Sequence, residues 1–151
     1  MLPNIWVVGD VMLDQTYIGS VNRVSPEAPV PVLQVTNVKY SPGGAGNVAT
    51  NLKALGANVT LLGLVGKDSQ AEHLKQSLNT LGVLTKFYSL LSQTITKIRA
   101  TSTQQLLRLD LESNYTLANE YQESLRNTFA NLDNVDLVVF SDYHKGLLGP
   151  W

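Results

Sequence analysis

The chain of 151 residues contains no cysteine, carries few charges and has no long hydrophobic run. The absence of cysteine excludes disulfides, thiolate nucleophiles and thiolate metal ligands. Charged residues make up 15% of the chain and the formal net charge is -1, which argues against nucleic-acid binding through a basic stripe. The run Ile5–Val8 is too short for a signal-peptide core or a membrane span, and no basic leader precedes it. We therefore expect a cytoplasmic protein that binds neither nucleic acid nor membranes.

Hydrophobic residues, 44% of the chain, fall into strand-like and helix-like patterns. Continuous apolar runs at 5–9, 58–66 and 135–140 indicate strands buried in a parallel sheet. Apolar residues at helical spacing predict three helices between them. The first ends at Gly56 with Val48, Leu52 and Leu55 inward; the second, capped by Asp68 or Ser69, turns Ala71, Leu74, Leu78 and Leu81 inward; the third, over about 117–132, turns Tyr121, Leu125 and Phe129 inward. This alternation predicts an α/β three-layer sandwich.

Two further pairs of segments do not fit that sandwich. Met12–Val21 and Val32–Val38 flank a proline-rich stretch, and prolines belong at sheet edges and in turns. The shorter segments 96–101 and 106–111 alternate basic with apolar residues. We predict that both pairs form exposed β-ribbons outside the main sheet, as a lid or an oligomer contact.

A glycine-rich stretch at 43–46 leads into the first helix and is followed by Asn47. Backbone N–H groups at a helix start, with no side chains to block approach, suit a polar small molecule, and Asn47 offers it a donor and an acceptor. Two alternatives remain: a turn that merely starts a helix, or a dinucleotide fingerprint, Gly44-x-Gly46-x-x-Ala49, with Asp68 as the ribose-binding acid. That fingerprint belongs directly after the first strand, whereas here the ribbons intervene, so we favour a sugar.

Polar residues also follow the first and last buried strands, at the edge where open α/β sheets bind ligands. Asp10 and Asp14 follow the first strand, and a carboxylate accepts sugar hydroxyls well; the alternative is a solvated turn aspartate. Residues 141–146 follow the last strand. His73 and His144 lack a metal-ligand spacing, so no metal site is expected.

Basic residues on the second ribbon suggest a site for an anion. Lys97, Arg99 and Arg108 occupy alternating positions, so they can share one face and bind a phosphate. A solvated cationic face is the competing interpretation.

The stretch Gly43–Gly66 resembles the first signature of the ribokinase-like (PfkB) carbohydrate kinases. More narrowly, 8–14, 23–32, 104–110 and 141–146 resemble the members of that family that act on a heptose 7-phosphate. The resemblance implies a ribokinase-like sandwich with a protruding β-ribbon lid. It also implies transfer of the ATP γ-phosphoryl group to the anomeric hydroxyl of D-glycero-β-D-manno-heptose 7-phosphate, for ADP-heptose and lipopolysaccharide core synthesis.

The resemblance also implies the roles of individual residues. Asp14, Gly43, Gly44 and Asn47 would hold the sugar hydroxyls. By their chemistry we assign Lys97, Arg99, Arg108 and Lys145 to the phosphate that the substrate already carries, and Asp142 to a hydroxyl. The family further implies a homodimer through the ribbons, which we place at roughly 11–40 and 95–111.

Family members are longer, and their general base, the metal-associated region and most of the ATP pocket lie in a part with no counterpart here. We therefore expect residues 1–151 to be the N-terminal part of one kinase domain, with an incomplete sheet and no catalytic base. ATP and Mg²⁺ would serve the full-length kinase, and none is expected on this fragment, which we expect to be inactive. The alternatives are another ribokinase-like sugar kinase or a non-catalytic sugar-binding or interaction module.

Overall fold

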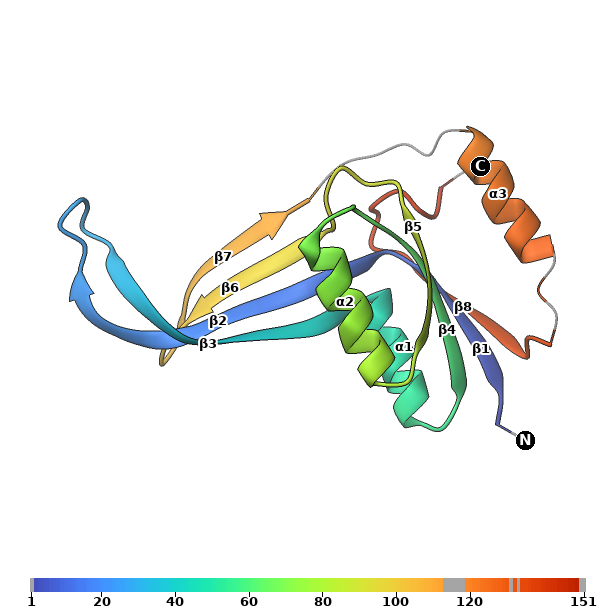
Figure 1. Ribbon diagram of the computed structural model, residues 1–151, viewed down its shortest axis with the longest axis horizontal. Helices are drawn as coiled ribbons and strands as arrows, with labels where there is room; N and C mark the ends of the chain where they lie inside the picture. Colours follow the sequence, from blue (N-terminus) through green and yellow to red (C-terminus); the bar gives the residue numbers. More distant parts are fainter. Residues whose placement is uncertain (1, 113–118, 131, 133, 150–151) are drawn as a thin grey trace.

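The computed structural model describes residues 2–112, 119–130, 132 and 134–149, and their strands form two sheets (Figure 1). The central sheet has the order β5-β4-β1-β8, and all its pairs are parallel. Its strands are β1 (Asn4–Gly9), β4 (Asn58–Val65), β5 (Leu84–Ser89) and β8 (Leu137–Ser141). The predicted parallel α/β sheet is confirmed, with the first strand of the chain inside it.

Helices cover both faces of the central sheet, which gives the predicted three layers. α1 (Ala45–Ala54) and α2 (Ser69–Thr80) pack on one face and bury the cluster around Val7, Leu61 and Leu74. α3 (Asn119–Ala130) contributes Leu125 and Phe129 to a cluster on the other face. Full burial of one such leucine contributes about 1.5–3 kcal/mol, so the two clusters dominate the stability of the fold.

Two leucines and one tyrosine that were predicted to face inward are exposed instead. Leu55 and Leu81 are 84% and 51% exposed because each is the C-cap residue of its helix, after which a glycine at positive φ turns the chain away. Tyr121, predicted inward, is 37% exposed near the start of α3. The predicted start of this helix, near residue 117, lies outside the described residues.

The remaining strands form the lid sheet, which projects from the α/β part (Figure 1). Its order is β3-β2-β6-β7, with β2 spanning Val11–Val24, β3 Pro31–Gly44, β6 Thr96–Thr101 and β7 Gln105–Leu111. β2 pairs antiparallel with β3 and parallel with β6. The two predicted ribbons therefore join edge to edge in one sheet.

The two faces of the lid sheet differ in polarity, because side chains alternate along a strand. The polar face holds Lys39, Asp14, Lys97, Arg99, Arg108 and Asp110 at matching register positions. The opposite, apolar face holds Tyr17, Val38, Tyr40, Ile98, Leu107 and Leu109. At its base Tyr40 stacks on His73 of α2, with ring centroids 4.1 Å apart.

β8 is less buried than the sequence predicts. Leu137 and Phe140 are 52% and 60% exposed, because β8 pairs with β1 on one side and has no partner on the other among the described strands. Among the described helices, none has the length and apolar character needed to cross a bilayer.

Candidate functional site

The candidate site is built where β1 and β3 end and α1 begins. Gly44 has φ 55°, a left-handed conformation that favours glycine, and a Cβ there would collide with the carbonyl oxygen of Asp10. The Ala45 N–H donates to that same oxygen over 3.0 Å. Gly44 thus lets the chain turn from the lid sheet into α1 against the end of the central strand.

Asp14 and Gly43 lie against each other, as the sugar-site hypothesis requires. In the β2–β3 ladder Met12 pairs with Gly43 and Asp14 with Ser41, so the Asp14 side chain reaches over the glycine. A Cβ on Gly43 would collide with Asp14 Oδ2. The missing side chain at position 43 therefore makes room for a carboxylate that is one-quarter exposed.

Asn47 lies in the first turn of α1, and its side chain is exposed. Its backbone carbonyl accepts a hydrogen bond from Thr50 Oγ1 over 2.9 Å. The exposed side-chain amide is thus three residues beyond Gly44 along the chain.

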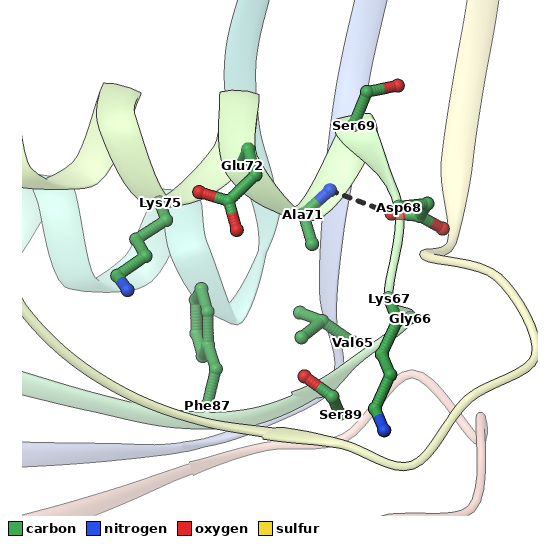
Figure 2. Close-up of a pocket in the computed structure, with 10 residues that line it drawn as sticks. All are labelled: Val65, Gly66, Lys67, Asp68, Ser69, Ala71, Glu72, Lys75, Phe87 and Ser89. Atoms are coloured by element: carbon green, nitrogen blue, oxygen red, sulfur yellow. Dashed lines mark hydrogen bonds between the residues drawn. The ribbon is translucent and has the colours of Figure 1, made fainter.

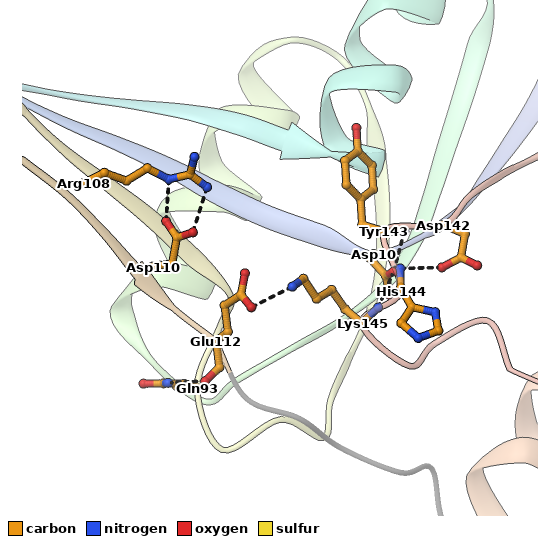
Figure 3. A network of polar contacts seen from close by, with 9 residues as sticks. All are labelled: Asp10, Gln93, Arg108, Asp110, Glu112, Asp142, Tyr143, His144 and Lys145. Atoms are coloured by element: carbon orange, nitrogen blue, oxygen red, sulfur yellow. Dashed lines mark hydrogen bonds and ion pairs between the residues drawn. The ribbon is translucent and has the colours of Figure 1, made fainter. Parts of the chain in front are cut away.

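Two predicted phosphate-binding arginines share the polar face of the lid sheet, and each is ion-paired there. Arg99 Nη1 donates to Asp14 Oδ1 over 2.5 Å, so the arginine holds the predicted sugar-binding carboxylate. Arg108 contacts Asp110 through two hydrogen bonds of 2.8 and 2.7 Å (Figure 3). These bonds raise the pKa of Arg108 and lower the pKa of Asp110 relative to their usual values.

Two lysines complete this face. Lys97 pairs in register with Asp14 on one side and Asp110 on the other, and it contributes to lowering the pKa of Asp110. Lys39, which the sequence analysis did not single out, lies opposite Thr16 on the neighbouring strand, and Thr16 in turn pairs in register with Arg99.

Residues 142–146, which we call the strand-end loop, carry the last two predicted site residues, Asp142 and Lys145, and lie beside Asp10 and Glu112 (Figure 3). Asp142 accepts a hydrogen bond from the His144 N–H over 2.7 Å, and His144 has φ 59°. Lys145 Nζ donates to Glu112 Oε2 over 2.7 Å, just beyond the end of β7. The loop is thus tied to the lid sheet, and the Lys145 ammonium is already paired with a carboxylate.

Asp68, the acid of the dinucleotide alternative, has a structural role instead. It caps α2 by accepting from the Ala71 N–H and also accepts from the N–H and hydroxyl of Thr94, at 2.9, 2.6 and 2.6 Å. Burial acts to raise the pKa of Asp68, but these hydrogen bonds lower it overall. Asp68 lines a hollow beside α2 and β5 (Figure 2). Neither Asp14 nor Gly43 lines this hollow.

Among the described residues, no three histidine, aspartate or glutamate side chains converge as metal ligands would. Asp14 pairs with Arg99 instead.

The parallel α/β sheet, the projecting lid sheet and the carboxylate beside a glycine turn are the arrangement that the resemblance to ribokinase-like carbohydrate kinases implies. The model of the pfkB family of carbohydrate kinases matches residues 3–148. The chain belongs to this family.

Curated relatives agree with this assignment. The chain is 48% identical over 146 residues to the bifunctional protein HldE of Shewanella putrefaciens, covering 95% of the chain and 30% of that relative. It is 47% identical over 147 residues to the bifunctional protein HldE of Shewanella loihica, covering 96% of the chain and 31% of that relative. The chain therefore spans about a third of the length of the curated relatives that it matches.

Solved structures share the fold. A putative phosphofructokinase from Staphylococcus aureus superposes with a TM-score of 0.76 at 18% identity, covering 96% of this chain and 45% of that one. Phosphofructokinase-2 from Escherichia coli, in complex with fructose-6-phosphate, gives a TM-score of 0.65 at 20% identity, covering 93% and 45%.

Proposed function

We propose that this chain is the sugar-binding part of a cytoplasmic, ATP-dependent kinase that phosphorylates D-glycero-β-D-manno-heptose 7-phosphate at its anomeric hydroxyl, for ADP-heptose and lipopolysaccharide core synthesis. The observation that carries the proposal is the carboxylate of Asp14, seated over Gly43 and flanked by Lys97 and Arg99. This arrangement offers an acceptor for sugar hydroxyls beside cations for a phosphate.

In this proposal Asp14, Gly43, Gly44 and Asn47 hold the sugar, with Asp142 as a further hydroxyl acceptor. Lys97 binds the phosphate most directly, because Arg99, Arg108 and Lys145 each have a carboxylate partner. All three supply positive charge around it; Arg99 and Arg108 exchange their partners for phosphate oxygens when the substrate binds, whereas Lys145 keeps its pair with Glu112.

Among the described residues, no group of three histidine, aspartate or glutamate side chains could hold a cation. We assign ATP, Mg²⁺ and the general base to a part of the kinase outside this chain. The chain alone is then inactive, because phosphoryl transfer depends on positioning and charge stabilisation by groups that it lacks. ATP-dependent phosphorylation by the purified chain would contradict this assignment.

The test is calorimetric titration of the chain with heptose 7-phosphate, with ribose, fructose 6-phosphate and ATP as comparisons. We expect selective binding of heptose 7-phosphate and no binding of ATP. In Lys97→Gln, affinity for heptose 7-phosphate should fall on the order of 10-fold, the loss of a charge-assisted hydrogen bond. Affinity for the unphosphorylated heptose should not change.

A different ranking of ligands would overturn the substrate assignment. Preference for fructose 6-phosphate would favour another ribokinase-like sugar kinase, the class of several structural neighbours. Binding of sugar with no kinase activity in any longer form of the protein would favour a non-catalytic sugar-binding module.

We also propose that the apolar face of the lid sheet binds a second copy of the chain. Leu107, Leu109 and Leu111 on that face are 52%, 46% and 37% exposed, at an edge strand whose outer side is unpaired among the described strands. Such a contiguous apolar face is typical of an interface. One structural neighbour is a tetrameric form of phosphofructokinase-2.

A further inference from the structure

Asp10 stands out among the described residues because it is a carboxylate buried to 2% exposure with no cation beside it in the described contacts. It directly follows β1, the strand between β4 and β8. A buried charge is costly unless hydrogen bonds compensate it, so its partners indicate why it is there.

Asp10 connects three parts of the molecule. Its backbone N–H donates to Ser141 at the end of β8, over 3.1 Å, and its carbonyl accepts from Ala45 at the start of α1. Its carboxylate oxygen Oδ2 accepts from the N–H groups of Tyr143 and Lys145, at 2.9 and 3.1 Å. One carboxylate therefore fixes two alternate amides of the strand-end loop, as Figure 3 shows.

The loop conformation depends on such an anchor. His144, between the two held amides, has φ 59°, and Gly146 has φ 101°. A left-handed conformation at a residue with a side chain is unfavourable and persists only where the surroundings impose it. The residues before and after His144 each donate a backbone N–H to the same carboxylate oxygen, and these two hydrogen bonds supply that restraint.

The loop in turn contacts the lid sheet. Lys145, held through its N–H by Asp10, reaches Glu112 with its ammonium, and both side chains are partly buried, at 22% and 33% exposure. A continuous chain of contacts therefore runs from the end of β1, through the loop, to the residue that follows β7.

We propose that Asp10 is a positioning residue: it anchors the strand-end loop so that Lys145 sets the lid sheet over the sugar phosphate. The effect on ligand binding rests on the proposed function; the anchoring does not. The second carboxylate oxygen, Oδ1, is buried and has no hydrogen-bond partner among the described residues. Burying this oxygen costs stability, so the hydrogen bonds of the carboxylate are concentrated on Oδ2 and the strand-end loop.

The test compares the intact chain with Asp10→Ala, which removes the anchor, and Asp10→Asn, which keeps the shape and one neutral acceptor. Asp136→Ala is the matched control, because Asp136 Oδ2 also accepts a backbone N–H, from Asn4 over 2.7 Å, at the opposite end of β1 and β8. Hydrogen exchange is measured at the amides of Tyr143 and Lys145 and along β7. Heptose 7-phosphate affinity is measured by calorimetry.

In Asp10→Ala we expect exchange at Tyr143 and Lys145 to rise on the order of 10-fold, with a smaller rise in Asp10→Asn. Exchange in β7 should rise with it, and Glu112→Gln should raise exchange in β7 while leaving the Tyr143 amide protected. Asp136→Ala should change none of these amides. Affinity for heptose 7-phosphate should fall in Asp10→Ala and Glu112→Gln.

Unchanged exchange at Tyr143 and Lys145 in both Asp10 variants would overturn the anchor, and unchanged exchange in β7 would overturn its link to the lid sheet. Equal effects in Asp136→Ala would reduce Asp10 to a general stabilising role. If the wild-type chain binds no sugar phosphate, the proposed function fails, while exchange still decides whether Asp10 holds the loop.

Discussion

At the scale of single residues, substitutions at two glycines test ligand binding and fold stability separately. In Gly43→Ala the new methyl group collides with Asp14 Oδ2, so the carboxylate must move. We expect affinity for heptose 7-phosphate to fall on the order of 10-fold or more, since the displaced acceptor loses its hydrogen bonds to the sugar. Calorimetry of folded protein measures this loss.

Gly56→Ala is the matched control for that substitution. Gly56 has φ 96°, and a Cβ there meets nothing within 4 Å. Strain at this helix end should cost about 1 kcal/mol of unfolding free energy and leave affinity unchanged. Equal affinity losses in both variants would argue against a specific place for Asp14 over Gly43.

At the scale of elements, the start of α2 should depend on pH through Asp68. Hydrogen bonds from Thr94 and Ala71 lower the pKa of Asp68 in the folded protein. A lowered folded pKa means that its stabilisation is present above the unfolded pKa, near 3.9, and is lost as pH falls through the folded value. As pH is lowered from about 5, the free energy of unfolding should therefore fall less in Asp68→Asn than in the wild type. Urea unfolding at a series of pH values measures this difference. Parallel stability curves would contradict this role.

The elements themselves were largely predictable, and the misses have physical causes. The runs at Ile5–Gly9 and 58–66 are apolar because both faces of the central sheet are covered, so periodicity found them. β5 was missed because it is an edge strand, and its sequence Leu84–Ser89 alternates exposed with partly buried residues around Lys86, which lies 5.6 Å from the Trp6 ring.

The residues of the candidate site could be proposed from the sequence, but the ion pairs that join them could not. Asp14 beside Gly43 follows from the family pattern, and the structure brings them together. The ion pair between Asp14 and Arg99 joins residues on β2 and β6, so it depends on the parallel pairing of two distant strands. No local pattern in the sequence contains that information.

At the scale of the whole molecule, the apolar face of the lid sheet should determine oligomeric state. Leu109→Lys places a charge in the proposed contact, and we expect sedimentation to shift from dimer to monomer because that charge must be desolvated. Asn37→Lys adds the same charge on the polar face and should leave the dimer intact. Asn37 lies on that face because it pairs in register with Ile18, which in turn pairs with Thr101. A monomeric wild-type chain would refute the interface.

The order of strands in the central sheet has a consequence for how the protein is made. β1 is synthesised first, yet its two neighbours, β4 and β8, begin about 50 and 130 residues later in the chain. At translation rates of roughly 5–20 residues per second, the second side of β1 stays unpaired for several seconds or more. During that time an apolar segment that ends among the innermost residues of the fold is exposed on the nascent chain, so the central sheet cannot be completed until β8 has been synthesised.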